Sequence, residues 1–185
     1  YECPSGLYNV NGGPSMDDCA PCSDSDAIAL CFISRYNKAS IGDVINMKAT
    51  AAYLAGTTSS SRPCDVNSAI CMSPVKGVTL NCADAESGGS GDTRCKFDGT
   101  SSTNRRLFYI RYLPSAQTFK LIGLRIYKGN SPSGYGGGIH FASNSGRISV
   151  TNCRFDSNSG GGIYFASNVG QISVTNCLFD SNSGG

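Results

Sequence analysis

The chain contains a near-perfect internal repeat of 24 residues. Residues 136–159 read GGGIHFASNSGRISVTNCRFDSNS, residues 160–183 read GGGIYFASNVGQISVTNCLFDSNS, and only four positions differ. Within each copy, apolar and polar residues alternate in three short segments bounded by Gly, Asn and Ser, which predicts three short strands. A unit of this size cannot bury its apolar side alone, so successive copies are expected to stack.

Stacking pairs each strand in parallel with its equivalent in the next copy, so the sequence predicts an all-β fold, a parallel β-helix with three short strands per rung. Equivalent apolar residues then lie on top of one another. The interior columns expected from the alternation are Ile139/Ile163, Phe141/Phe165, Ile148/Ile172, Val150/Val174, Cys153/Cys177 and Phe155/Phe179. The differences between the copies, such as His140/Tyr164 and Arg154/Leu178, mostly fall at positions that this alternation places outside.

Two short motifs within the copies are similar to motifs of known repeat proteins. The glycines before Ile163 and the Phe-x-x-Asn runs at Phe155–Asn158 and Phe179–Asn182 resemble the repeats of the polymorphic outer-membrane protein family and, more broadly, the pectin-lyase-like superfamily. The resemblance implies a right-handed β-helix at a cell surface, where such family members act as adhesins. The alanine of the family's Gly-Gly-Ala-Ile signature is absent, because Ile follows the glycines directly.

The chain divides into a cysteine-rich lead-in at 1–22 and a β-helix domain at 23–185, the latter cut within a repeat. A capping helix is expected at 24–36, where Ser23 or Ser25 can cap the start and residues 27–33 form an apolar run. Irregular rungs are expected at 41–117 and regular rungs at 118–185. The lead-in, with Cys3-Pro-Ser-Gly-Leu-Tyr8 and Cys19-Ala-Pro-Cys22, resembles the end of a growth-factor-receptor-like module.

Ten cysteines in 185 residues indicate disulfides and an oxidising, extracellular compartment. Local bridges are expected for Cys82–Cys95 and Cys64–Cys71, and a further one for Cys3–Cys19. Cys153 and Cys177 lie in an interior column, so we expect them to be buried thiols. The disulfide candidates are Cys3, Cys19, Cys22, Cys31, Cys64, Cys71, Cys82 and Cys95.

Charge and hydropathy exclude some function classes. A net charge of +2 argues against a nucleic-acid-binding protein, and the longest apolar run, at 27–33, is too short to span a bilayer. Segment 51–135 is more basic, with ten Lys or Arg against five Asp or Glu. An anionic polysaccharide could dock there, although a scattered, solvated face explains the same charges. The residues that dominate this segment are Arg94, Lys96, Arg105, Arg106 and Arg111.

No pattern predicts a catalytic, cofactor-binding or metal-binding site. His140, the only histidine, is expected to point outward and stack against Tyr164. Asp156 and Asp180 stack at one turn position, where paired carboxylates could bind calcium or act as acid and base. A residue repeated at the same turn is more often structural.

Polar columns also follow from the repeat. Asparagine side chains can donate to one rung and accept from the next, so ladders are expected at Asn144/Asn168, Asn152/Asn176 and Asn158/Asn182. Outward hydroxyls form a grid at Ser149/Thr151 and Ser173/Thr175. Such a grid suits ice binding, O-linked sugars or a plain polar surface, and two rungs do not distinguish these.

These features predict a non-catalytic extracellular rod, structural or adhesive, that forms part of a surface fibre. Near-identical rungs favour a periodic scaffold, because an active site needs unlike residues brought together. The expected partners are further copies of the chain, or the rest of its own chain, stacked end to end, with surface glycans as a further candidate. The alternative is a polysaccharide-binding or polysaccharide-cleaving, pectate-lyase-like protein whose active rungs lie outside this segment.

Overall fold

The computed structural model describes residues 36, 39–47, 52–54, 68–82, 94–100, 105–131 and 133–184. The regular structure in these ranges consists of short strands. The cysteine-rich lead-in and, apart from Tyr36, the expected capping helix lie outside the described residues, as do Cys3, Cys19, Cys22, Cys31 and Cys64.

The strands form three sheets, and every pairing within them is parallel. The first sheet contains β1 (Val44–Met47), β4 (Thr79–Cys82), β7 (Thr118–Ile122), β10 (Arg147–Thr151) and β13 (Ile172–Thr175). The second contains β2 (Ala52–Leu54), β5 (Cys95–Asp98), β8 (Leu124–Tyr127), β11 (Arg154–Asp156) and β14 (Leu178–Asp180). The third contains β3 (Ser68–Met72), β6 (Arg106–Arg111), β9 (Ile139–Ala142) and β12 (Ile163–Ala166).

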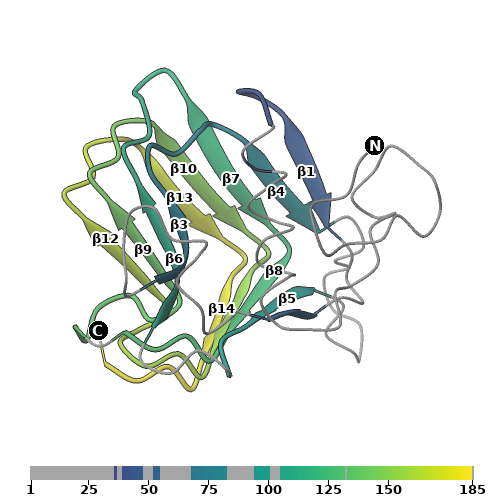
Figure 1. The fold of residues 1–185 in the computed structure, drawn as a ribbon, viewed down its shortest axis with the longest axis vertical. Coiled ribbons are helices and arrows are strands. Elements are labelled where there is room, and N and C mark those ends of the chain that lie inside the picture. Colours follow the sequence, from purple (N-terminus) through teal and green to yellow (C-terminus); the bar gives the residue numbers. More distant parts are fainter. Residues whose placement is uncertain are drawn as a thin grey trace.

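Each strand therefore pairs with the strand three places earlier and three places later in the chain. Consecutive strands visit the three sheets in turn, and one visit to each makes a rung (Figure 1). This order is consistent with a parallel β-helix, as the repeat predicts. The rungs before residue 118 use strands at 79–82, 95–98 and 106–111, where sequence patterns had indicated irregular rungs.

The register between the last two rungs follows the 24-residue period. Ile148 pairs with Ile172, Phe155 with Phe179, and Phe141 with Phe165. Upstream rungs keep the same inward pattern with other apolar residues, since Ile148 also pairs with Phe119 and Phe155 with Ile126. The interior columns therefore continue through rungs whose sequences differ from the repeat.

Phenylalanine fills much of the interior, where Phe97, Phe108, Phe119, Phe141 and Phe155 are almost completely buried. Between the last two rungs, the Phe155 and Phe179 rings stack with centroids 5.0 Å apart and planes within 9°. The Phe141 and Phe165 rings stack in the same way, at 5.2 Å.

The second copy of the repeat is less buried than the first. Ile172, Val174 and Phe179 are 37%, 41% and 49% exposed, whereas their equivalents in the first copy are at most 2% exposed. The expectation that Ile172 and Phe179 are buried is therefore wrong for this structure. The reason is that the rung at 160–183 is covered on one side only.

Glycine recurs in the repeat where the backbones of neighbouring rungs approach closely. A Cβ atom on Gly170 would lie 1.8 Å from the carbonyl oxygen of Gly146, and one on Gly137 would lie 1.9 Å from that of Ser159. No side chain fits at such distances, so these turns require glycine for space.

Two of the three asparagine columns form ladders. Asn144 Nδ2 donates to Asn168 Oδ1, and Asn158 Nδ2 donates to Asn182 Oδ1, both at 2.8 Å. Each inner amide also donates to a carbonyl oxygen of the preceding rung, that of Ile110 for Asn144. The third column differs, because Asn152 and Asn176 occupy a rung corner with φ near +54°, a conformation that asparagine tolerates better than most residues.

Replacing Phe155 with Ala is expected to lower the free energy of unfolding by about 3–5 kcal/mol, because the ring is fully buried and stacked. The matched variant Phe179→Ala should cost clearly less, since that ring is half exposed. Equilibrium denaturation of both variants, monitored by circular dichroism, measures the difference. Equal losses would contradict the burial described here.

Candidate functional site

The outward face of the second sheet carries two charged columns. Lys96, Arg125 and Arg154 are register partners on β5, β8 and β11. Two residues further along the same strands lies a second column, made of Asp98, Tyr127, Asp156 and, on β14, Asp180. A column of cations therefore runs along the axis of the stack beside a column made mostly of carboxylates.

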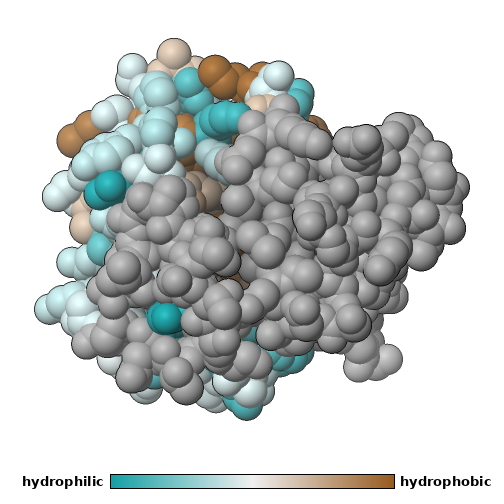
Figure 2. All heavy atoms as spheres, in the orientation of Figure 1, coloured by the Kyte–Doolittle hydropathy of each residue, from teal (hydrophilic) through white to brown (hydrophobic). Residues whose placement is uncertain are grey.

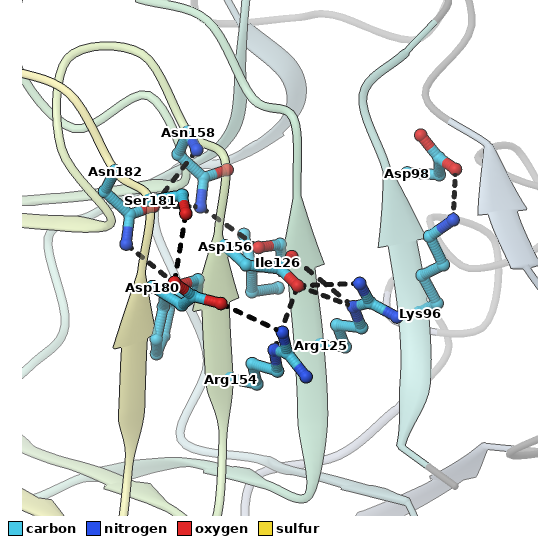
Figure 3. Close-up of polar contacts among 11 residues, drawn as sticks. Lys96, Asp98, Arg125, Ile126, Arg154, Asp156, Asn158, Asp180, Ser181 and Asn182 are labelled. Carbon is cyan, nitrogen blue, oxygen red and sulfur yellow. Dashed lines mark hydrogen bonds and ion pairs between the residues drawn. The ribbon is translucent and has the colours of Figure 1, made fainter. Parts of the chain in front are cut away.

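Ion pairs join these two columns (Figure 3). Asp156, with a side chain only 4% exposed, accepts a hydrogen bond from Arg125 at 2.7 Å and forms an ion pair with Arg154 Nε at 2.9 Å. Arg154 also reaches Asp180 in the next rung, at 3.2 Å. Each carboxylate of the repeat thus lies against an arginine, and the arginine lies between two carboxylates that would otherwise repel.

Lys96 and Asp98 form the other ion pair of this face, at 2.6 Å. Burial raises the pKa of Asp98, but hydrogen bonds from Lys96 and Thr100 outweigh it and leave the pKa below its usual value. Lys96 also lies 4.4 Å from the centre of the Tyr127 ring, and Arg125 lies 5.0 Å from it. The face is therefore a network in which the charges bind one another.

This network works against calcium binding at Asp156 and Asp180. Their oxygens face arginine nitrogens, and a cation placed there would be repelled by two guanidinium groups. Across the described residues, no cluster of three or more His, Cys, Asp or Glu side chains could hold a metal ion.

The outward face of the third sheet is aromatic. Tyr109, His140 and Tyr164 are register partners on β6, β9 and β12. Their ring centres are 5.1 Å and 5.0 Å apart, and the planes are tilted by 59° and 70°. Tyr135, from the loop before β9, packs on Tyr164 at 4.9 Å. His140 thus contacts Tyr164 as the sequence predicts, but the rings meet edge to face and are not stacked.

Arginines border this aromatic column. Arg106 is nearly buried, and its guanidinium is in close contact with His140 Nδ1 and donates to Ser133. Arg111 lies at the far end of β6, over the rings of Tyr109 and Tyr112. The basic segment found in the sequence is therefore divided among the three sheets, since Lys120 lies on the first, Lys96 on the second, and Arg106 and Arg111 on the third.

The hydroxyl grid lies on the outward face of the first sheet. Ser149 and Thr151 are 3.5 Å apart at their oxygens, and Ser173 and Thr175 are 3.3 Å apart. The grid ends at β7, where Lys120 is the register partner of Ser149. Its hydroxyl pairs bond within each rung, which leaves a small polar area without a convergent site.

The cysteines of the described residues fall into two chemical groups. Cys82 and Cys95 form the predicted bridge, with sulfurs 2.10 Å apart, and Cys71 is disulfide-bonded as well. Cys153 and Cys177 are free thiols in the interior column; Cys153 is buried as predicted, whereas the prediction is wrong for Cys177, which is only partly buried. A hydrogen bond between them raises the pKa of buried Cys153 well above its usual range and lowers the pKa of Cys177 to about 6.

Figure 2 shows one face of the molecule, on which the described residues are mostly polar or weakly polar and apolar residues gather at the upper and left margins. In the described ranges, no helix is long and apolar enough to cross a membrane.

Comparison with known proteins does not place the chain in a family. No protein-family model matches it, and no curated protein and no solved structure matches it significantly.

Sequence reasoning missed the charged network of the second sheet. The signal was present in three short patterns, a cation followed two residues later by Asp or Tyr, at Lys96-Phe-Asp98, Arg125-Ile-Tyr127 and Arg154-Phe-Asp156. Only the alignment of these strands brings the patterns together.

Replacing Asp156 with Asn is expected to destabilise the chain by about 2–4 kcal/mol, because it leaves two arginines side by side at a nearly buried position. Asp180→Asn is the control, since that side chain is half exposed and contacts one arginine, and its loss should stay below about 1 kcal/mol. Urea unfolding at low and high salt measures both. A loss at Asp180 as large as that at Asp156 would refute the network as described.

Alkylation should distinguish the two free thiols. Iodoacetamide reacts with thiolates, so Cys177 is expected to react first, at a rate that rises as the pH passes through about 6. Cys153 should stay unmodified in the folded chain, because it is buried and its pKa is raised. Mass spectrometry of proteolytic peptides after timed alkylation gives the two rates. Similar rates at the two sites would contradict this assignment.

Proposed function

We propose that this chain is a non-catalytic extracellular rod, structural or adhesive, built as a right-handed parallel β-helix and forming part of a surface fibre. The observation that carries the proposal is the equivalence of successive rungs. The rung at 160–183 covers Ile148, Val150 and Phe155 of the rung before it, and it exposes Ile172, Val174 and Phe179 on its other side.

A further rung with the same repeat would cover Ile172, Val174 and Phe179, just as these residues cover Ile148, Val150 and Phe155. Such a contact joins unlike faces, the top of one rung and the bottom of the next. Contacts of this kind do not close on themselves, so they extend a rod. The further rung can belong to the same chain or to another copy.

The polar groups support a structural role. The asparagine ladders and the ion pairs both join one rung to the next, along the axis of the stack. His140 packs among aromatic rings and Arg106, and the repeated carboxylates bind arginines. These contacts occupy the groups that an acid–base mechanism would need.

The disulfide chemistry supports an extracellular setting. Structural bridges such as Cys82–Cys95 are typical of secreted proteins and rare in reducing compartments. The same chemistry suits a fibre that is exposed outside the cell, because bridges within a rung hold the irregular part of the stack together.

End-to-end association is tested with two neighbouring residues of β13. Val174 faces the interior column and Ser173 faces outward, and both are exposed in this structure. Val174→Lys should abolish concentration-dependent association, because it places a charge on the surface that receives the next rung. Ser173→Lys adds the same charge outside the stack and should leave association unchanged. Sedimentation velocity and electron microscopy of the 185-residue chain measure the outcome.

Two results would overturn the proposal that copies stack. One is a chain that stays monomeric at all concentrations, and the other is equal behaviour of the two lysine variants. The first would leave stacking within one longer chain as the remaining form of the rod.

A further inference from the structure

One rung departs from the repeat at a corner of the third sheet. In the regular rungs this corner is Ala142-Ser143 and Ala166-Ser167, and in the earlier rung it is Arg111-Tyr112, with Arg111 the register partner of Ala142. Ser143, Ser167 and Tyr112 all have φ between +53° and +61°. Positive φ is uncommon for a bulky residue, and yet Tyr112 stands there half exposed.

Arg111 is held in place by neutral groups. Its Nε donates to Ser73 Oγ at 2.8 Å, and its guanidinium lies 5.5 Å from the Tyr109 ring centre and 4.7 Å from that of Tyr112. Within the described residues, no carboxylate pairs with Arg111. The two terminal amino groups of the Arg111 guanidinium are therefore held in place but make no hydrogen bond within the described residues. A carboxylate can bind such a guanidinium through both of its oxygens.

A strip of aromatic side chains continues from this arginine along the axis. It passes from Tyr109 to His140 and Tyr164. The column beside it, beyond Arg111, consists of Ala142 and Ala166, so the register positions there carry only methyl side chains. The strands of the third sheet contain Arg106 and Arg111 but neither Asp nor Glu.

We propose that Arg111, Tyr109, Tyr112, His140 and Tyr164 form a binding strip for an extended acidic peptide segment of a partner protein, with one partner carboxylate paired to Arg111. The inference deepens the adhesive part of the proposed function and rests on it. Arg111 offers a positive charge that pairs with no carboxylate of the described residues, so its charge complements such a segment. Tyrosine and arginine are also the residue types enriched at the energetic centres of protein interfaces.

Ring geometry favours a peptide over a polysaccharide. Sugars stack on flat aromatic faces, whereas Tyr109, His140 and Tyr164 are tilted by 59° and 70° against one another. The three rings therefore do not form one flat platform, and the tyrosines of the strip carry hydroxyl groups. These suit hydrogen bonding to carboxylates and to the polar groups of an extended backbone.

The test measures fluorescence anisotropy of a labelled peptide of alternating Glu and Gly, added to the 185-residue chain at low salt. The chain should bind this peptide and not its Gln–Gly counterpart, and salt should weaken binding. Arg111→Gln should reduce affinity about tenfold. Arg111→Lys should reduce it by less, because the charge stays but the bidentate geometry is lost. Tyr112→Ala should also weaken binding.

Two control variants test the location. Lys120→Gln removes the same charge from the first sheet, and Tyr127→Ala removes an outward tyrosine that lies among cations on the second sheet. Both should bind like the unmodified chain. Thermal unfolding by circular dichroism confirms that each variant folds. If Arg111→Gln does not fold, the affinity of Arg111→Lys decides the test.

Several outcomes would overturn the proposal. These are equal losses for Lys120→Gln and Arg111→Gln, loss of binding in Tyr127→Ala, no loss in Arg111→Gln, or binding of polygalacturonate without binding of the peptide. Repeating the peptide-binding assay on Val174→Lys, the variant expected not to associate end to end, tests the binding strip independently of the proposed rod. Peptide binding that persists in that variant supports the strip whatever the chain's association state, and absent peptide binding beside normal end-to-end association refutes the strip alone.

Discussion

In-register stacking is the constraint on which the rest of this structure depends. Each residue of a rung has its equivalent one strand spacing away, about 4.8 Å along the axis, so every side chain must tolerate a copy of itself. Phenylalanine meets this condition by parallel stacking, as Phe155 and Phe179 do. Asparagine meets it because an amide both donates and accepts, as Asn158 and Asn182 do. In the repeat, Phe141 and Phe155 stack on their equivalents, and Asn144 and Asn158 form ladders with theirs.

Charged residues do not meet the condition by themselves. A column of arginines or of aspartates places like charges within repelling distance. The second sheet resolves this by setting a cation column beside an acid column, so that Asp156 lies between Arg125 and Arg154, and Arg154 between Asp156 and Asp180. In the second copy, Leu178 replaces the arginine. The cation column ends there, and Asp180 is compensated from the rung below.

The regular part of the fold could be predicted because the repeat period and the apolar alternation agree on which residues stack and which face inward. The spacing of 24 residues sets the register, and the alternation sets which residues face inward, so Ile148/Ile172 and Phe155/Phe179 follow from the sequence. Burial of the second copy could not be predicted in the same way. The exposure of Phe179 depends on whether a neighbouring rung is present, and no local pattern encodes this.

The outward contacts could be predicted only in part. The asparagine ladders and the contact of His140 with Tyr164 follow from the repeat, whereas the edge-to-face geometry of that contact does not. The ion-pair network and the setting of Arg111 involve rungs with other spacings, since Arg111 precedes its register partner Ala142 by more residues than one repeat. The lengths of the turns decide how the strands of these rungs align. The composition of the basic segment did not indicate that its arginines divide between two sheets.

A periodic scaffold also determines where unlike residues can meet. Within identical rungs each column holds one residue type, so chemical variety arises only where a rung departs from the repeat. The third sheet shows such a departure twice, in the Tyr109–His140–Tyr164 column and at the corner where Arg111-Tyr112 stands in place of Ala-Ser. The corner conformation, with φ near +60°, suits a small residue better than a tyrosine. Positive φ recurs at the corners of the other rungs, for example at Ser143 and Ser167, so the conformation belongs to the scaffold and the side chains at this corner are what distinguish it. Chemical variety at one corner of a periodic scaffold is the reason for proposing the binding strip there.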